Sequence, residues 1–475
     1  MLIMMKQQTS EDLSTILNSL KRAHLKHGPA SAALRRDRLL RAVQLLSENH
    51  LALSAAINQD FGHRSAYQTL LADVLSSIGA LKFAAEHVEQ WMQPEVVAAP
   101  AEGMQTWIQQ QPLGVVGIIS PWNFPLNLAF GPLAGIFAAG NTAMLKPSEL
   151  TPHTSELLAE LVARYFKPHE LVVVLGDAEV GQAFSALPFD HLVFTGSSAV
   201  GKHIMRTAAE NLVPVTLELG GKSPVVIAES ADVQQAAQRI MTVKTFNAGQ
   251  ICVSPDYLFL SDAQEKAFVA AAQQFISESF PSVQHNNDYT SIVSPRHFER
   301  LVALLSDAQS KGAKIISLAP EGEPDIDAVT RKIAPHLILN VTDEMLIMQE
   351  EIFGPLLPVK TYQLFEETIN YINAHPRPLA AYYFGQDQAQ QQHFAIHTTS
   401  GALVINDVMT HASIDTLPFG GVGASGIGAY HGVHGFRRFT HAKAVVVQSM
   451  DGASNLRLRA PYEQKQATLT ALFNN

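Results

Sequence analysis

The stretch that decides the fold is residues 191–203, which read HLVFTGSSAVGKH. The apolar run that ends at Thr195 is typical of a buried strand, and the residues after Ser198 are typical of a helix. Gly196 and Ser197 form the turn between them, where free backbone N–H groups suit a phosphate or pyrophosphate. The stretch therefore indicates a strand–turn–helix unit of the kind that binds nucleotides.

Three interpretations of this turn stay open. Gly196, Gly201 and Lys202 fit the phosphate loop G-x-x-x-x-G-K-[ST] up to its last position. That position holds His203, which supplies no hydroxyl for magnesium, so a nucleoside triphosphatase is disfavoured. A plain turn without a ligand is the second interpretation. We favour the third, a dinucleotide turn that lacks the usual G-x-G-x-x-G.

The flanking sequence repeats the alternation of strand and helix. Short β-branched runs bounded by Gly and Pro predict strands at 115–119, 142–145 and 171–175, and a second series follows Glu218 at 225–228, 257–260, 314–318, 336–339 and 403–406. Alternating strands and helices form parallel sheets with crossover connections. The sequence thus predicts an α/β fold with two closely packed domains and a ligand site in the cleft between them.

The region before this alternation is predicted to be helical. Leu39, Ala42, Val43 and Leu46 have the i, i+3, i+4, i+7 spacing of one helix face, and the run from Leu13 to Leu20 repeats it. With 475 residues, 47% of them hydrophobic, the chain is long enough to bury the core of two or three domains.

Charge and targeting patterns exclude several classes of protein. A net charge of -10 gives no basic field for nucleic acid. Met1 to Lys6 resemble no signal peptide, and the longest apolar stretch, 128–139, is interrupted by glycine and proline and is too short for a bilayer. The one cysteine forms no intrachain disulfide. We expect a soluble cytoplasmic protein with no membrane or nucleic-acid partner.

The histidines near the end of the chain do not predict a metal site. His431 and His434 have H-x-x-H spacing, but Gly432 and Gly435 argue against a regular helix that would present them together. The sequence also contains no H-E-x-x-H motif. We therefore expect no catalytic metal.

Three side chains could carry chemistry. Cys252 lies in FNAGQICVSPDY (246–257), among turn formers that could present its sulfur to a cleft, although a free cysteine is more often a buried small hydrophobe. Glu218 follows an apolar run where a strand leaves the core, or is simply a surface carboxylate. Asn123 lies in the rigid loop PWNFP (121–125), where its amide could stabilise an oxyanion or only form a turn.

Together these segments closely resemble the aldehyde dehydrogenase superfamily, whose landmarks occur in order from Pro112 to about Val447. The resemblance implies that Cys252 is the nucleophile, Glu218 the general base and Asn123 the oxyanion donor. It implies cofactor contacts at Ile119, Ser120, Pro121, Trp122, Lys146, Ser148, Glu149, Gly196, Ser197, Val200, Leu219, Gly220, Glu351 and Phe353. Within that set, Lys146 and Glu149 match adenosine-ribose contacts, and Glu351 and Phe353 match the nicotinamide end.

The family's fold implies a Rossmann-type dinucleotide-binding domain at 1–95 and 112–217, an α/β catalytic domain at 218–438, a small β oligomerisation flap at 96–111 and 439–450, and a tail at 451–475. Residues 418–436 resemble the class-three branch and the similar coniferyl aldehyde dehydrogenases, which implies a homodimer. Some relatives carry a membrane-anchoring tail, but the charged residues between 452 and 475, such as Arg457 and Lys465, argue against one here.

The implied activity is the NAD(P)-dependent oxidation of a coniferyl, aromatic or bulky aldehyde to its acid. The intermediates are a thiohemiacetal and a thioester on Cys252, and Glu218 activates the water that hydrolyses the thioester. Glu149 would repel a 2'-phosphate, so NAD is expected first and NADP second. Alternatives are an aliphatic aldehyde dehydrogenase, a coenzyme-A-acylating enzyme and a non-catalytic binding protein. Candidates for lining the substrate pocket are Trp122, Asn127, Ile251 and His411.

Overall fold

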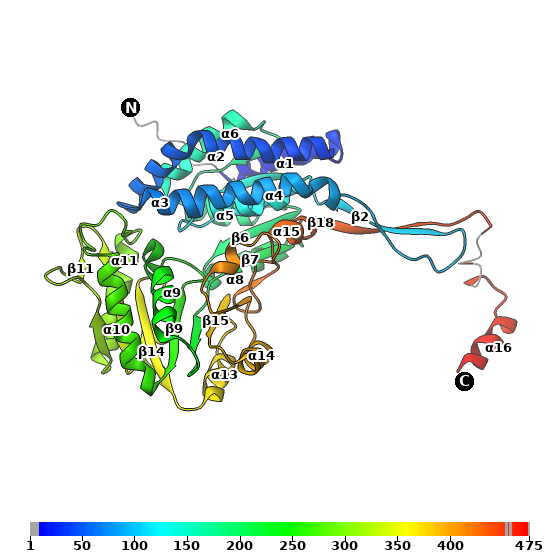
Figure 1. The fold of residues 1–475 in the computed structure, drawn as a ribbon. Coiled ribbons are helices and arrows are strands. Elements are labelled where there is room, and N and C mark those ends of the chain that lie inside the picture. The colour runs from blue at the N-terminus through cyan, green and yellow to red at the C-terminus, as the bar shows by residue number, and fades with distance from the viewer. Residues whose placement is uncertain (1–8, 452–454, 456–457, 474–475) are drawn as a thin grey trace.

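The chain is represented by a computed structural model that describes residues 9–451, 455 and 458–473. The expectations for Met1 to Lys6 and for Arg457 lie outside these residues. Figure 1 shows two bodies and an arm: the helices α1, α2 and α4 cover one body, α9, α10 and α11 belong to the other, and β2 and β18 form the arm.

The first body is built on a six-stranded sheet with the order β17-β7-β6-β3-β4-β5. Its strands are β3 (Val115–Ile119), β4 (Thr142–Lys146), β5 (Leu171–Val173), β6 (His191–Gly196), β7 (Val215–Leu219) and β17 (Gly426–Ile427). The first five are parallel, and β17 pairs antiparallel with β7. Strand order reverses between β3 and β6, and in such doubly wound sheets ligands bind outside the carboxyl ends of the strands at this point.

Helices cover both faces of this sheet. They are α1 (Ser10–His27), α2 (Ala32–Phe61), α3 (Ala66–Thr69), the π-helical turn η1 (Leu70–Leu75), α4 (Ser76–Trp91), α5 (Asn127–Ala138), α6 (Pro152–Tyr165), α7 (Ala178–Ser185) and α8 (Ser198–Ala209). The two amphipathic runs predicted near the start lie in α1 and α2, where Leu13, Leu17, Leu39 and Leu46 are buried. The predicted helical region is therefore confirmed.

The second body is built on a seven-stranded sheet with the order β10-β13-β14-β9-β8-β15-β16. Its strands are β8 (Ser223–Ile227), β9 (Pro255–Ser261), β10 (Lys314–Ser317), β13 (His336–Leu339), β14 (Leu356–Tyr362), β15 (Ala380–Phe384) and β16 (Ala402–Ile405). All neighbours are parallel except β10 and β13. The α/β class with two parallel sheets is confirmed.

Two strands near the middle of this sheet were not predicted. Pro358 lies in β14, and proline normally argues against an interior strand. β15 begins with two alanines, which have low strand propensity. Both strands are nonetheless buried within the sheet, so tertiary packing overrides the local preference.

The remaining helices and small strands surround the second sheet and the cleft. They are α9 (Val233–Thr245), η2 (Phe246–Gly249), α10 (Asp262–Ser279), α11 (Pro295–Ser310), β11 (Ile326–Asp327), β12 (Lys332–Ile333), α12 (Leu346–Gln349), α13 (Phe365–Ala374), α14 (Gln388–His397), η3 (Thr410–Ser413), α15 (Gly432–Arg438) and α16 (Glu463–Leu472). One hydrophobic core contains residues of both sheets, such as Val193 and Val225. The two bodies therefore pack closely, as the lack of a flexible linker predicted.

The glycines at 432 and 435 were expected to argue against a regular helix that presents His431 and His434 together. His431 does precede the helix, with φ of 92°, but a helix forms directly after it. The segment 432–438 is the helix α15, and it includes His434. A Cβ on Gly135 of α5 would lie 2.9 Å from the backbone of Gly435, so α5 and α15 approach at a distance that glycine permits. Close packing against α5 thus stabilises a helix that sequence preference disfavours.

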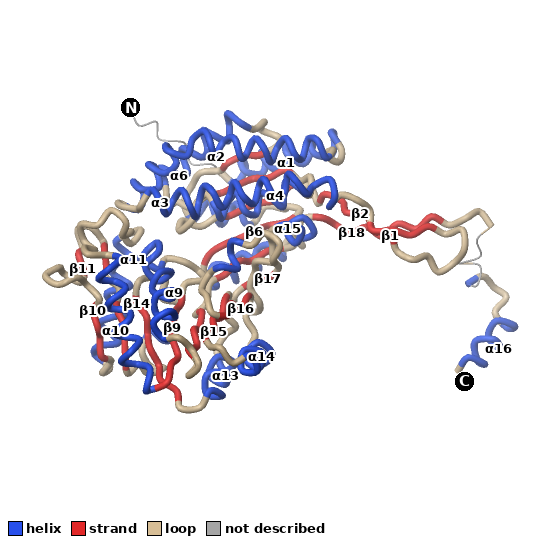
Figure 2. Tube along the Cα trace, viewed as in Figure 1, coloured by secondary structure: helices blue, strands red, loops and turns tan. Residues whose placement is uncertain are grey.

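A three-stranded antiparallel sheet forms the arm, with the order β1-β2-β18. Its strands are β1 (Glu95–Val96), β2 (Gln105–Pro112) and β18 (Thr440–Val447). Figure 2 shows the arm extending from the first body, with α16 near its outer end. No described helix is long and apolar enough to span a bilayer.

Candidate active site

A cavity of about 900 Å³ lies between the two bodies. Residues of the first sheet and its loops line one side, including Asn123, Gly196 and Glu218. Residues of the second body line the other side, including Cys252 and Glu351. The three side chains for which chemistry was predicted thus lie around one space, in the cleft that the two-domain pattern indicated.

Cys252 is presented by a tight loop between α9 and β9. Asn247, Ala248 and Gly249 all adopt left-handed backbone angles, with φ of 50°, 51° and 71°. A Cβ at Gly249 would lie 2.4 Å from the carbonyl oxygen of Gly354, so only glycine fits there. Successive left-handed residues are costly, and their presence indicates a loop that the surrounding structure holds in place.

Gln250 supplies much of that support. Its side-chain amide donates to the backbone oxygens of Asn247 at 2.9 Å and Ser291 at 3.1 Å. Its side-chain oxygen accepts from the backbone N–H of Val293 at 3.0 Å. Because Gln250 is 1% exposed, these bonds are shielded from water. The nucleophile candidate is therefore held on a rigid loop.

The loop that carries Asn123 is joined to the cysteine loop. The Asn123 Nδ2 donates to the backbone oxygen of Gln250 at 3.2 Å, and Asn247 Nδ2 donates to the same oxygen at 3.1 Å. Asn123 is 3% exposed. A hydrogen bond to the cysteine loop thus fixes the orientation of the Asn123 amide.

A buried ion pair that the sequence did not predict anchors this loop. Arg64 donates to the backbone oxygen of Asn123 at 2.8 Å and pairs with Asp73 at 2.8 Å. Asp73 also accepts from the backbone N–H groups of Leu126 and Asn127. Both charged side chains are fully buried. Charged residues are normally solvated, so the sequence alone did not show that this pair is buried.

Glu218 enters the cavity from β7. It is 3% exposed, and within the described part of the chain neither carboxylate oxygen has a hydrogen-bond partner. The alternative that it is a surface carboxylate is therefore excluded. Burial raises the pKa of Glu218 well above its usual range, and the charge of Arg438 opposes that rise.

The environment of Cys252 is also unfavourable to charge. Burial raises the pKa of the thiol to about 12, and the carboxylates of Glu351 and Glu218 add to the effect. The backbone N–H groups of Cys252 and Val253 act in the opposite direction because they hydrogen-bond the sulfur. These N–H groups are therefore close to the atom that would bond to a substrate carbon.

Glu351 lines the cavity from the second body, whereas Glu218 extends from the first sheet. Burial and Asp256 raise its pKa to about 8, whereas a hydrogen bond from the backbone N–H of Gly221 lowers it. A Cβ at Gly220 would lie 2.0 Å from a Glu351 oxygen, so glycine is needed for this close approach. The other oxygen, Oε1, is buried without a partner among the described residues. A ribose hydroxyl would satisfy it.

Aromatic contacts connect the two sides of the cavity. Trp122 lies edge-on to Phe353 with ring centroids 5.4 Å apart, and edge-on to His297 at 5.1 Å. Trp122 follows β3, whereas Phe353 and His297 belong to the second body. Such contacts are favourable beyond the area they bury, so they hold the cleft at a fixed width.

The predicted cofactor residues divide into two groups. Eight line the cavity, namely Pro121, Trp122, Gly196, Ser197, Leu219, Gly220, Glu351 and Phe353. Six do not, namely Ile119, Ser120, Lys146, Ser148, Glu149 and Val200. The second group follows the carboxyl ends of β3, β4 and β6, where Ile119 pairs with Lys146. There Lys146 is buried and pairs with Glu149 at 2.8 Å.

The turn at the start of α8 is confirmed as a strand–turn–helix unit. β6 ends at Gly196, and Ser197 caps α8 by accepting from the backbone N–H of Val200. The unpaired N–H groups of this helix end lie at the switch point of the sheet, beside the cavity. This arrangement fits a dinucleotide whose pyrophosphate lies at the helix end and whose ribose reaches Glu351.

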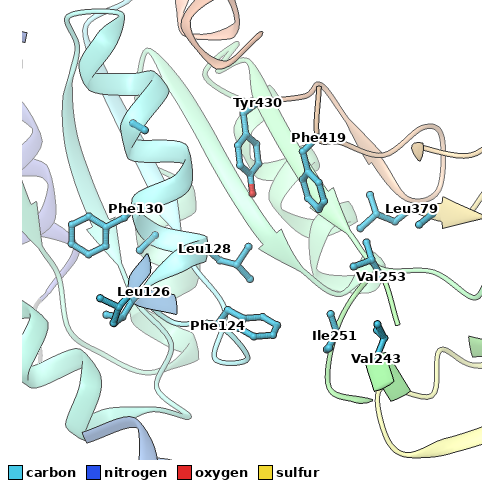
Figure 3. Packing of buried hydrophobic residues seen from close by; sticks show 14 of the residues in the cluster. Phe124, Leu126, Leu128, Phe130, Val243, Ile251, Val253, Leu379, Phe419 and Tyr430 are labelled. Carbon is cyan, nitrogen blue, oxygen red and sulfur yellow. The ribbon is translucent and has the colours of Figure 1, made fainter. Parts of the chain in front are cut away.

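Apolar side chains surround another part of the cavity. Figure 3 shows Leu128 on one side and Phe419 and Leu379 on the other, and all three line the cavity. Of the pocket candidates, Trp122 lines the cavity, whereas Asn127, Ile251 and His411 do not. His411 instead stacks behind Phe419, with ring centroids 5.8 Å apart. This wall suits an aromatic or aliphatic group better than a charged one.

The described residues contain no group of three or more His, Cys, Asp or Glu side chains that could hold a metal. The groups that line the cavity and could carry chemistry are a thiol, a buried carboxylate and an amide.

Comparison with known proteins gives a consistent result. The model of the aldehyde dehydrogenase family matches residues 1–445. A coniferyl aldehyde dehydrogenase of a Pseudomonas species is 59% identical over 453 residues, which is 95% of this chain and 94% of that protein.

Solved structures agree. A substrate-bound AldH of Staphylococcus aureus has a TM-score of 0.90 and 35% identity, over 97% of this chain and 99% of that one. An indole-3-acetaldehyde dehydrogenase of P. syringae, in complex with NAD+, has a TM-score of 0.85 and 26% identity, over 93% and 90%.

Proposed function

This chain belongs to the aldehyde dehydrogenase family, and we propose that it oxidises coniferyl aldehyde, or a similar aromatic aldehyde, to the carboxylic acid through a thioester on Cys252. The observation that carries the mechanism is that Cys252, Glu218 and Asn123 line one buried cavity. The 59% identity to a coniferyl aldehyde dehydrogenase supports the substrate, as does the apolar wall at Leu128 and Phe419.

In the first step, the Cys252 thiol transfers its proton to the Glu218 carboxylate, which passes it to solvent, and the sulfur forms a bond to the aldehyde carbon. The carbonyl π electrons move to oxygen, which becomes the oxyanion of a thiohemiacetal. In this proposal the Asn123 amide and the backbone N–H of Cys252 donate to this oxygen. Loss of one such donor typically costs about 100- to 1,000-fold in rate.

The cofactor NAD(P), when bound, supplies the acceptor for the hydride that leaves the thiohemiacetal carbon. This chain's contribution is to hold the two partners in position. Glu351 offers its free oxygen to a ribose hydroxyl, and Trp122 and Phe353 flank the space beside it. After hydride loss the oxyanion electrons re-form the C=O bond, which leaves a thioester on Cys252.

The second step is hydrolysis of that thioester. Glu218 takes a proton from water, the oxygen forms a bond to the acyl carbon, and the carbon–sulfur bond breaks so that the Cys252 thiolate leaves. A carboxylate without hydrogen-bond partners suits this role, because neither of its oxygens is already occupied by a donor. The product is the carboxylic acid.

We propose that the cofactor-binding region also discriminates between NAD and NADP. Glu149 is half-exposed and already paired with Lys146 at 2.8 Å. A 2'-phosphate beside this carboxylate would be repelled, although the side chain has room to turn away. NAD is therefore expected to bind more tightly than NADP. Glu149→Gln should lower the KM for NADP relative to the KM for NAD.

We further propose that the chain forms a homodimer through the arm. Val96 and Val446 are 84% and 60% exposed, and such apolar side chains on an exposed edge strand suit a partner surface. We also propose a division into domains. The dinucleotide-binding domain is 1–95 with 112–217, the catalytic domain is 218–438, the flap is 96–111 with 439–450 and the tail is 451–475. Within 218–438, β17 and α15 return to the first body. Sedimentation should give a dimer mass, and Val446→Glu should give a monomer.

The main alternative, transfer of the acyl group to coenzyme A, needs no water-activating carboxylate. The buried Glu218 therefore favours hydrolysis. The test is NADH formation with coniferyl aldehyde and with aliphatic aldehydes, with and without coenzyme A, for wild type and Cys252→Ala. We expect coenzyme A to leave the rate unchanged and the variant to be inactive. Undiminished turnover of Cys252→Ala would disprove the thioester mechanism.

A further inference from the structure

A guanidinium lies on the same face of the sheet as Glu218. Arg438, the last residue of α15, donates from Nε to the hydroxyl of Thr216 at 2.8 Å and also to the backbone oxygen of Val215. Thr216 and Glu218 are two residues apart on β7. Side chains at this spacing point to the same face of a strand, about 7 Å apart along it.

The opposing strand leaves room for this arginine. Gly426 pairs with Glu218 and Ile427 pairs with Leu217, and continuing this register places Gly428 beside Thr216. A Cβ at Gly428 would lie 2.7 Å from Arg438 Nε. The guanidinium therefore lies beside Thr216, on the face of β7 that carries Glu218, in space that a side chain at position 428 would otherwise fill.

The opposite face of β7 is apolar. Val215, Leu217 and Leu219 all belong to the hydrophobic cluster formed with β6, α1, α7 and α8. The charge is thus placed on the Glu218 side of the strand, and the apolar side chains are placed on the other. This alternation confirms the shared face independently of the hydrogen bonds.

Three groups act electrostatically on Glu218 or are acted upon by it: Cys252 from the loop before β9, Tyr430 from the segment before α15, and Arg438. His191 of β6 shares the Thr216 hydroxyl at 2.8 Å, but burial and Arg438 lower the pKa of His191 to about 3, so it is neutral. Of these groups, Arg438 is the cation.

We propose that Arg438 is a positioning residue whose charge favours the ionised form of Glu218, the form that can take a proton from the water that hydrolyses the thioester. The inference rests on the proposed role of Glu218. A buried carboxylate without hydrogen-bond donors is otherwise driven to the neutral acid, which cannot act as a base.

The two side chains influence each other in the direction this requires. Burial raises the pKa of Glu218, and the charge of Arg438 lowers it. Burial lowers the pKa of Arg438, and the charge of Glu218 raises it. Replacing Arg438 with a neutral residue therefore moves the pKa of Glu218 further upward, and turnover then needs a higher pH.

The test is the pH profile of kcat for wild type and Arg438→Gln. An opposite charge within about 4–6 Å lowers the pKa of a carboxylate by about 1–3 units, and we take the lower end because the guanidinium is hydrogen-bonded to Thr216 and Val215 and not to Glu218. We therefore expect the acidic limb of the profile to move up by about one pH unit in Arg438→Gln, with about tenfold lower kcat on the limb and equal kcat at high pH. A purely structural role would lower kcat by one factor at every pH, and that result would overturn the proposal.

Two variants make the result specific. Arg437→Gln removes the neighbouring charge, which is exposed, and should leave the profile of the wild type. Arg438→Lys keeps the charge and should restore most of the acidic limb. If the acidic limb of Arg438→Lys moved up by as much as that of Arg438→Gln, the proposal would be overturned. This comparison holds even if the glutamine variant folds poorly.

A direct measurement separates this inference from the role of Glu218. Infrared difference spectra between each chain and its Glu218→Gln counterpart follow the protonated carboxyl without any turnover. The carboxyl of Glu218 should persist to higher pH in Arg438→Gln than in wild type, and equal titrations would overturn the inference. Full activity of Glu218→Gln would instead disprove the proposed base.

Discussion

Two glutamates line one cavity, Glu218 from the first sheet and Glu351 from the second body, and they differ in what surrounds them. Glu218 extends from β7 and makes no hydrogen bond to the described residues through either oxygen. Glu351 follows α12, accepts from the backbone N–H of Gly221, and is close to the charges of Lys222 and Arg300. Both have a raised pKa because both are buried. Burial alone therefore does not distinguish a base from a binding group.

The difference lies in the hydrogen bonds. A carboxylate that is held by donors has a fixed direction and little freedom to accept a proton from water, which suits a group that orients a ligand. A carboxylate without donors is free to take a proton. We infer that the first description fits Glu351 and the second fits Glu218. Each prediction below tests this contrast.

The largest effect is expected for Glu218→Gln. Removing a general base typically costs about 100- to 10,000-fold, and the loss should fall on thioester hydrolysis. The first turnover forms NADH before water is needed. Stopped-flow measurements should therefore show a burst of about one NADH per active site, followed by a very slow steady state.

Glu351→Gln provides the matched control in the same experiment. It should raise the KM for the cofactor by about fivefold, which corresponds to the loss of about 1 kcal/mol in one hydrogen bond, and should leave no burst. If both variants gave a burst, or neither did, the two glutamates would not have separate roles.

The next largest effect is expected for Gly220→Ala. The new Cβ would lie 2.0 Å from a Glu351 oxygen, so the carboxylate must move away from its position. Overpacking of this kind costs about 1–3 kcal/mol, which predicts a loss of cofactor affinity of roughly 5- to 150-fold by titration. Gly79→Ala is the control, because a Cβ there meets nothing within 4 Å. Unchanged cofactor binding in Gly220→Ala would mean that Glu351 does not hold the cofactor.

The contrast between the two glutamates could not be predicted from sequence. The resemblance to the family correctly assigned the fold and the enzyme class, and the strand–turn–helix unit ending at Gly196 and Ser197 was predicted from its local pattern. These features depend on residues adjacent in the chain. The charges that act on Glu218 and Glu351 come from residues distant in sequence, such as Arg438, and local patterns carry no information about them.

The same limit explains the other failures. β14 was missed because Pro358 disfavours an interior strand, and α15 was missed because glycine disfavours a helix. In both segments tertiary packing prevails over local preference. The buried pair of Arg64 and Asp73 was missed because charged residues are usually solvated.

A smaller effect is expected on the reactivity of Cys252. The carboxylate of Glu351 raises the pKa of this thiol more than that of Glu218 does, after burial itself. At pH 9, above the pKa of about 8 for Glu351, Glu351→Gln should speed alkylation by iodoacetamide about three- to tenfold, because the thiolate is the reactive form. Since Cys252 is the only cysteine in the chain, the labelling rate reports on this site alone.

The pH dependence provides the control for this measurement. At pH 6 the carboxyl of Glu351 is neutral, so Glu351→Gln and wild type should react at equal rates. Glu218→Gln should give a smaller acceleration at pH 9. A larger acceleration in Glu218→Gln than in Glu351→Gln would show that Glu218, and not Glu351, has the larger effect on the pKa of the Cys252 thiol.

The smallest effect is expected on stability. Glu351 has a pKa of about 8 in the folded chain against an ordinary value of 4.5, so the folded state keeps a proton that the unfolded state releases. Stability therefore falls as pH rises from about 4.5 to 8 and is constant above that. Glu351→Gln lacks this loss of stability. Its Tm should exceed that of wild type by a few degrees at pH 8 and should equal it at pH 4.5.

Glu218→Gln should show a Tm difference of the same sign, because the pKa of Glu218 is also raised. A difference in Tm that did not change with pH would show that the carboxyl of Glu351 is not buried as an acid, and the two glutamates would then differ in burial as well as in hydrogen bonding.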